Sequence, residues 1–179
     1  MTSSLEELAR VPKSELTALY DAGTQPEPAS LVDWEFRGYN RPFLTRVGGF
    51  QKFRKGFYRH EGAFWGYNIN VVQGALERPW SSRPSDDAPR RFGFFSVRPV
   101  GPREAEGREP GSLLFNYADA KNRLLEGSFL RDYVKLVEAG NPDLLLGKAY
   151  SSIAGAELMP TWFIIQRDRP APTPVVHPG

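Results

Sequence analysis

The chain of 179 residues contains no cysteine and only two histidines, and these shortages exclude several kinds of site. Without cysteine, the protein forms no disulfide, no thiolate metal site and no cysteine nucleophile, and its composition fits a reducing compartment. His60 and His177 are too few for a histidine-rich metal site, and no clustered carboxylate signature of the Asp-x-Asp-x-Asp type occurs. The sequence therefore predicts no metal site.

Long hydrophobic runs and strong charge are also missing. No run approaches the roughly 18 apolar residues of a membrane helix, and the residues from Met1 to Glu7 lack the basic and apolar regions of a signal peptide. The net charge of +2 is small for this length, so global electrostatics gives no support to nucleic acid as a partner. We expect a cytoplasmic protein without a membrane span, and the sequence predicts no oligomeric state.

Short apolar runs and turn residues are present instead. The chain has 17 glycines and 16 prolines, more than suits a helical bundle, and its hydrophobic content of 40% fits a folded chain of about one domain. Apolar runs bounded by turn residues recur at 64–72, 91–100, 111–116, 144–150 and 161–167. Short strands at regular spacing predict an all-β or mainly β fold, in which an antiparallel sheet closes into a barrel or curls strongly.

Two short helices are predicted before the sheet. Ser4 and Ser14 are suitable N-caps for two successive helices, and Gly23 is placed to end the second one. From Pro170 onward, proline recurs without a core-forming pattern. We therefore divide the chain into an N-terminal helical segment that packs on the barrel (1–23), an antiparallel β-barrel domain (24–168) and a proline-rich flexible tail (169–179).

Hydrophobic periodicity is clear in one segment and ambiguous in another. In residues 31–39, Val32, Trp34 and Phe36 alternate with charged residues, which predicts a strand with one buried face. In residues 124–139, the apolar residues fit a helical stripe slightly better than they fit a strand. A barrel favours a strand at this point, and we predict the strand.

Several short features follow one another in an order that a known kind of barrel shares. They are LTALYD (16–21), Trp34 with Gly38, LLGK (145–148), and WFI (162–164) with Arg167. This order resembles the lipocalin-like (calycin) barrels, in particular the bacterial GXWXG family, although the sequence around Trp34 lacks the two glycines of that motif. The resemblance implies a barrel that holds a small apolar or amphipathic ligand, and it supplies no catalytic residue.

A barrel of this kind directs alternate side chains inward, so polar residues within apolar runs mark a possible pocket. Such residues must bond to one another, to water or to a ligand, unless they face solvent or lie at strand ends. They are Asn68, Asn70, Asn116, Tyr117, Arg123 and Tyr133. We predict a pocket lined by Trp34, Phe36, Tyr67, Tyr117 and Tyr150, in which Asn70 and Arg123 orient a polar group of the ligand.

Catalysis has little direct support in the sequence. No Gly-x-Ser-x-Gly elbow is present and His60 is the one histidine outside the tail, so a serine triad is not predicted. No Gly-x-Gly-x-x-Gly motif or P-loop supports a nucleotide, and His60 is expected at a surface turn rather than on a haem, so we predict no cofactor. Acid–base chemistry of an isomerase or cyclase type stays open as an alternative, with Asp119, Lys121, Asp132 and Lys148 as its candidates.

A basic and aromatic stretch from residue 37 to residue 59 gives a second alternative. Cations beside stacking rings are typical of proteins that bind single-stranded nucleic acid, and they also suit an anionic lipid. The other interpretation places the rings in the core and the cations on a solvated face. The cations are Arg37, Arg41, Arg46, Lys52, Arg54, Lys55 and Arg59, and the rings are Tyr39, Phe43, Phe50, Phe53, Phe57 and Tyr58.

Overall fold

The computed structural model of the protein describes residues 3–41, 50–101, 109–122, 129–153, 156–157, 161–172 and 174–178. Its strands are β1 (Trp34–Asn40), β2 (Lys52–His60), β3 (Ala63–Asn70), β4 (Arg91–Pro99), β5 (Leu113–Asn116), β6 (Leu130–Leu136), β7 (Leu144–Ile153), β8 (Ala156–Glu157) and β9 (Thr161–Pro170). Its helices are α1 (Leu5–Leu8) and α2 (Lys13–Ala22), with the single 3-10 turns η1 (Pro28–Ser30) and η2 (Tyr117–Asp119).

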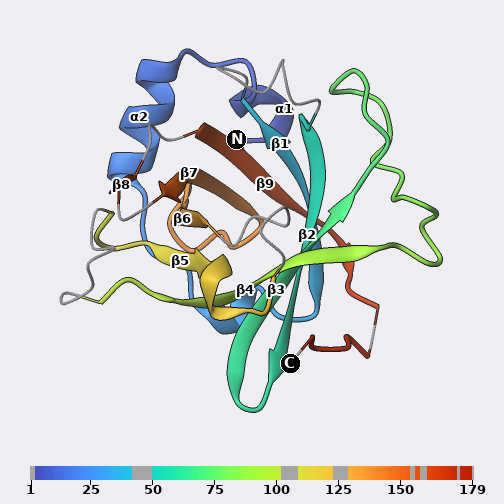
Figure 1. The fold of residues 1–179 in the computed structure, drawn as a ribbon. Helices are drawn as coiled ribbons and strands as arrows, with labels where there is room; N and C mark the ends of the chain where they lie inside the picture. The colour runs from blue at the N-terminus through green and yellow to red at the C-terminus, as the bar shows by residue number, and fades with distance from the viewer. Residues whose placement is uncertain are drawn as a thin grey trace.

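Eight of the described strands close an antiparallel barrel (Figure 1). Consecutive strands from β1 to β7 pair with one another, and β9 lies between β7 and β1 and completes the ring, while β8 pairs with β7 alone. The predicted mainly β fold with N-terminal helices is therefore confirmed. The architecture is compatible with a lipocalin-like fold. Among the residues that the structure describes, no helix is long and apolar enough to span a membrane.

The ambiguous segment contains strand β6. Leu130–Leu136 pairs with β5 on one side and with β7 on the other, which confirms the strand for these seven residues. The pairing partners on both sides decide the conformation, because a helix at this point would leave two strand edges unpaired. Residues 124–128 of the predicted strand lie outside the described residues.

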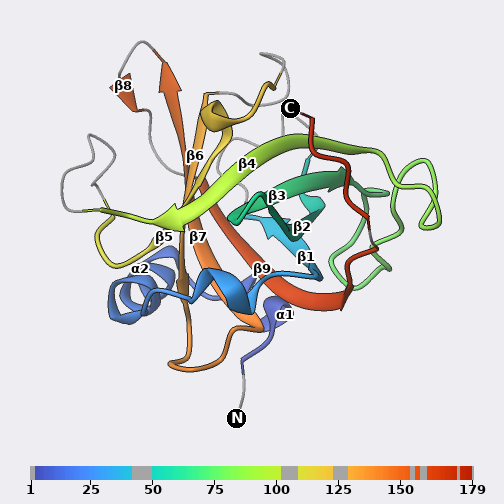
Figure 2. The ribbon, with the colours of Figure 1, turned by 90° about the horizontal axis from the view of Figure 1, so that it is seen from below.

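The two N-terminal helices pack against the outer face of β7 and β9 (Figure 2). Ser4 caps α1 as predicted, and Glu7 completes a capping box with it. The second N-cap differs from the prediction, because α2 begins at Lys13 after Pro12 and thus contains Ser14 within its first turn. The helices bury Leu5, Leu8, Leu16 and Tyr20 against Leu144, Leu146, Trp162 and Ile164.

The C-terminal segment lies along the outer face of β2 and β3. Residues 174–178 contain no helix or strand, yet Val175 packs against the cluster around Tyr58. The ring of His177 stacks on His60 with 4.2 Å between ring centroids, and its Nδ1 lies 2.8 Å from the Tyr58 hydroxyl. The described part of the segment that we predicted as a flexible tail thus contacts the barrel wall, and the flexibility of this tail stays a prediction.

Inside the barrel, one half is filled by aromatic rings, which we call the packed half. Phe57 contacts Phe36, Phe95 and Phe115, with ring centroids 5.3, 5.9 and 5.3 Å apart. Glycine provides the room for these rings: a Cβ at Gly66 would lie 2.2 Å from the Phe95 ring. These ring contacts therefore fill the packed half with aromatic side chains.

Candidate ligand-binding pocket

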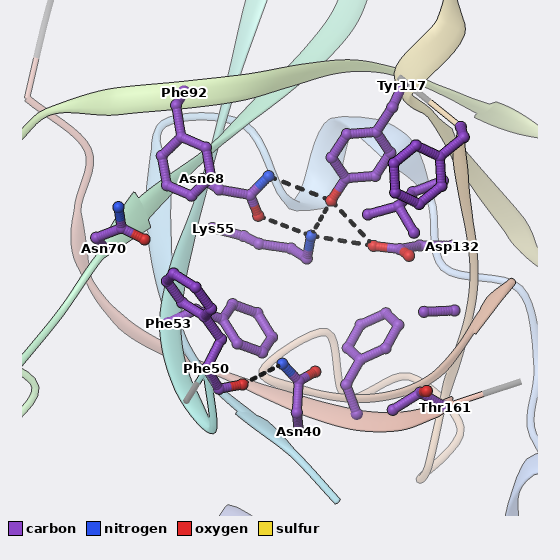
Figure 3. A pocket seen from close by; sticks show the side chains of 14 residues that line it. Asn40, Phe50, Phe53, Lys55, Asn68, Asn70, Phe92, Tyr117, Asp132 and Thr161 are labelled. Atoms are coloured by element: carbon purple, nitrogen blue, oxygen red, sulfur yellow. Dashed lines mark hydrogen bonds and ion pairs between the residues drawn. The ribbon is translucent and has the colours of Figure 1, made fainter. Parts of the chain in front are cut away.

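The other half of the barrel interior contains a cavity of about 380 Å³ (Figure 3). It lies where β1 and β3 end and β9 begins, so that Asn40, Asn70 and Thr161 stand around its mouth. Its wall is mostly apolar and is made by Phe50, Phe53, Phe92, Phe129, Leu130, Ala149 and Phe163. The volume falls within the range of about 300–1,000 Å³ that is usual for small-molecule sites.

Four polar side chains form the inner surface of the cavity, which we call the polar floor: Lys55, Asn68, Tyr117 and Asp132. Strand pairing places Lys55 of β2 directly opposite Asn68 of β3. Tyr117 follows β5 and Asp132 lies on the adjoining strand β6. Lys55, Asn68 and Asp132 face inward from their strands, and Tyr117 reaches the same place from the start of η2, so closing the barrel brings the four together although they are distant in sequence.

The three donors of the Lys55 ammonium are all used within the polar floor. Nζ donates to Asn68 Oδ1 over 2.9 Å and to the Tyr117 hydroxyl over 2.5 Å, and it lies 3.0 Å from Asp132 Oδ2. The Tyr117 hydroxyl in turn donates to Asp132 Oδ2 over 3.1 Å. Lys55 therefore has no donor left over for a ligand while this arrangement is kept.

Asn68 is equally committed. Its Nδ2 donates to the Gly93 carbonyl oxygen over 2.9 Å and to the Tyr117 hydroxyl over 3.2 Å. By contrast, both hydrogen bonds to Asp132 reach Oδ2, and Oδ1 receives none from any residue in the described part of the chain. Figure 3 shows the dashed lines meeting at one oxygen of Asp132. As far as the described residues show, the floor thus keeps one hydrogen-bond acceptor without a donor beside the cavity.

Aromatic rings surround the ammonium on its remaining sides. Lys55 Nζ lies 4.8 Å from the centroid of Phe95, 5.4 Å from Phe53 and 5.6 Å from Phe163. Ring faces attract a cation, and this attraction is stronger where water is excluded. The rings of the packed half and of the cavity wall therefore both help to hold the charge of Lys55.

Burial shifts the proton equilibria of the floor. The side chains of Lys55 and Asp132 are only 4% and 5% exposed. Desolvation lowers the pKa of Lys55, while the nearby charge of Asp132 acts in the opposite direction. Desolvation also raises the pKa of Tyr117 well above its usual value, and Asp132 adds to this effect. Tyr117 is therefore a neutral donor at neutral pH.

The residues that we predicted for the site are divided between three places. Asn70 and Tyr117 line the cavity. Phe36 lies in the packed half, and Trp34 packs against the same core at the start of β1, away from the cavity mouth. Arg123 lies outside the described residues.

Tyr67 and Tyr150 lie on the outer side of the barrel instead. The Tyr67 hydroxyl donates to Glu35 Oε1 over 3.0 Å, and the Tyr150 hydroxyl donates to Glu109 Oε1 over 2.5 Å. The strand period explains the first of these differences, because Tyr67 and Asn70 are an odd number of residues apart and cannot share a face of a regular strand. Neither tyrosine contributes to the wall of this cavity.

Sequence reasoning did not single out Lys55 as a pocket residue and considered Asp132 only as one acid–base candidate. A signal for both is present. Lys55 alternates with Phe53 and Phe57, and Asp132 alternates with Leu130 and Val134, so each is a charge on the apolar face of a strand. The other acid–base candidates lie elsewhere: Asp119 bonds to Ser96 and Asn116, and Lys148 contacts Glu109.

The cations of the basic stretch are mostly engaged within the protein. Arg37 pairs with Glu6, Arg54 with Asp168, and Arg41 donates to carbonyl oxygens of residues 8, 9 and 11. Lys52 donates to carbonyl oxygens of residues 75, 78 and 79, and Arg59 lies over the ring of Phe64. Arg46 and Phe43 lie outside the described residues. These contacts favour structural roles for the described cations.

Comparison with family models and with curated proteins does not identify a family for this chain. No protein-family model matches it, and no curated protein matches it. The resemblance to the GXWXG family is therefore not confirmed by a family match, and the functional argument depends on the geometry of the cavity and its polar floor.

Proposed function

We propose that the barrel binds a small amphipathic molecule, with its apolar part between the phenyl rings of the cavity and its polar end at the polar floor. One observation carries the proposal: a buried ion pair, Lys55 and Asp132, closes the inner end of a cavity whose wall is mostly apolar. Such a pair is weak support for stability, because desolvation offsets much of its attraction and an apolar pair of similar volume often does as well. Convergent polar groups in an apolar pocket are the usual form of a ligand site.

The first test is extraction of the purified protein with organic solvent, followed by mass spectrometry, and calorimetric titration with amphipathic molecules. Tryptophan fluorescence is a poor primary readout, because none of the four tryptophans lines the cavity. We expect a co-purifying compound in stoichiometric amount, or saturable binding at one site. The proposal would be contradicted if no compound co-purifies and if no alcohol, acid, amine or terpenoid shows saturable binding.

Blocking the cavity gives a sharper version of this test. Ala149→Trp places a large ring on the wall, whereas Ala63→Trp adds the same ring at an exposed position at the start of β3. The first variant should lose binding, and the second should retain it. Equal binding by both folded variants would show that the ligand lies elsewhere.

The polar floor also favours a second candidate function, proton transfer on the bound molecule. Tyr117, Lys55 and Asp132 form one hydrogen-bonded unit beside the cavity, and such units serve as acids and bases in enzymes. Exchange of ligand C–H hydrogen for deuterium in D₂O, followed by NMR, measures this activity. Exchange that Asp132→Asn abolishes would support catalysis, whereas tight binding without exchange supports binding alone.

A further inference from the structure

The polar floor restricts the head group that a ligand can present. The three donors of Lys55 and the amide hydrogens of Asn68 already have partners within the protein. The Tyr117 hydroxyl donates to Asp132 Oδ2. The unmet hydrogen-bonding capacity of the floor is therefore acceptor capacity, above all at Asp132 Oδ1.

The charge of the floor points in the same direction. Among the described residues that line the cavity, Lys55 and Asp132 are the charged ones, so the lining is neutral as a whole. A ligand carboxylate would bring a second anion beside Asp132, and a ligand ammonium would bring a second cation beside Lys55. A charged head group of either sign would have to lose its water in a buried site where the opposite charge of the floor is already paired, and this desolvation is costly.

We propose that the ligand is an uncharged amphipathic molecule whose polar end is a hydrogen-bond donor, an inference that rests on the proposed function. A hydroxyl is the head group that fits best. The hydroxyl donates to Asp132 Oδ1, and the apolar body of the ligand lies in the cavity against the rings of Phe53, Phe92 and Phe163. An aldehyde or ether of the same length fits less well, because it accepts hydrogen bonds but cannot donate one. A site built for a donor rejects an analogue that lacks it.

The test is a series of ligands with one chain and different heads: decanol, decanal, decyl methyl ether, decanoate and decylamine, each titrated into the unaltered protein by calorimetry near neutral pH. We expect decanol to bind at least about tenfold more tightly than the ether and than decanoate, since about 1.4 kcal/mol corresponds to a factor of ten. Binding of decanoate or of decylamine as tight as that of decanol would overturn the inference. Failure of every compound to bind would instead contradict the proposed function.

Substitutions at the floor identify the atom responsible. Asp132→Asn keeps the shape of the side chain and removes the negative charge, so the preference for decanol over decanoate should fall by about tenfold. Asp87→Asn changes the same charge at an exposed position and should leave the preference unchanged. The double substitution Lys55→Met with Asp132→Leu makes the floor apolar, and the preference for decanol over its methyl ether should then vanish.

One alternative pose is distinguishable. A carboxylate at the mouth, near Asn40, Asn70 and Thr161, would leave the chain end of the ligand against the polar floor. Binding in that pose would be insensitive to Asp132→Asn. An unchanged ratio of decanol to decanoate affinity in the folded Asp132→Asn variant would therefore overturn the assignment of the head group to Asp132.

Discussion

The two halves of the barrel interior are bordered by inward-facing residues of some of the same strands, among them β2 and β4, yet one half is packed with rings and the other contains a cavity. In the packed half, the rings of Phe36, Phe57, Phe95 and Phe115 pack together and connect β1, β2, β4 and β5 across the interior. In the other half, Phe53 and Phe163 also contact each other, with ring centroids 6.2 Å apart, but the phenyl rings leave a cavity beside them. The polar floor lies between the two halves.

This difference shows how a barrel can combine stability with a binding site. The packed half supplies apolar burial, which is the main favourable term in folding. Two of its rings also lie near the ammonium of Lys55: the centroids of Phe95 and Phe115 are 4.8 and 5.9 Å from Nζ. We expect the packed half to keep its arrangement whether or not a ligand fills the cavity. Substitutions that act on one half alone test this division.

The largest effect on stability is expected in the packed half. Phe57→Ala removes a ring that contacts three others and is 1% exposed. We expect a loss of about 3–5 kcal/mol in the free energy of unfolding, measured by urea denaturation. A loss below about 1 kcal/mol would show that this half is loosely packed, which would contradict the difference drawn between the two halves.

The polar floor should show a loss of similar size for a different reason. Lys55→Met leaves the carboxylate of Asp132 buried without its cation, which costs about 3–5 kcal/mol in the free energy of unfolding. Adding Asp132→Leu removes that unpaired charge, so the double variant should recover most of the stability. A double variant as unstable as Lys55→Met would mean that the ion pair itself stabilises the fold.

The contrast between these halves also marks how far the sequence could predict the structure. Alternation and regular turn spacing were enough for a mainly β barrel, because the period of two is a property of each strand alone. The same alternation could have placed Lys55 inside, between Phe53 and Phe57. We counted it instead with its basic neighbours, since a local pattern does not reveal which face of a strand the barrel encloses.

The partners of Lys55 were beyond local patterns. Asn68 is on the neighbouring strand, but Tyr117 and Asp132 reach Lys55 only across the closed barrel. Closure depends on the pairing of β9 with both β7 and β1, which is a long-range feature. The same limit applies to Tyr150, which we predicted to line the pocket, and to Tyr133, whose placement we left open. The two rings pack together on the outer side.

Two inward-facing glycines permit a direct comparison between the halves. A Cβ at Gly66 would lie 2.2 Å from the Phe95 ring, and a Cβ at Gly147 would lie 2.1 Å from the Phe163 ring. Phe95 is held by Phe57 and Phe115, whereas Phe163 lines the cavity and has space to move. We expect Gly66→Ala to cost about 3 kcal/mol in the free energy of unfolding and Gly147→Ala about 1 kcal/mol.

Ligand affinity should show the reverse order: the variant that loses less stability, Gly147→Ala, should lose more affinity. In Gly147→Ala, the displaced Phe163 ring occupies part of the cavity, so ligand affinity should fall although stability changes little. Gly66→Ala should retain its affinity as long as it is folded. Equal losses of stability in the two variants, measured by urea denaturation, would contradict the idea that the cavity half has free space.

The smallest effect on stability is expected at the mouth of the cavity. Phe50 is 55% exposed and lines the cavity, and Val72 is 46% exposed and lies outside it. Phe50→Ala and Val72→Ala should each lower the free energy of unfolding by less than about 1 kcal/mol, because about half of each residue stays in water in the folded protein. Binding should separate them: a ligand that covers the Phe50 ring buries apolar area worth about 1 kcal/mol, so Phe50→Ala should weaken calorimetric affinity about fivefold and Val72→Ala should not. An affinity loss shared by both variants would mean that exposed apolar surface in general, rather than this cavity, holds the ligand.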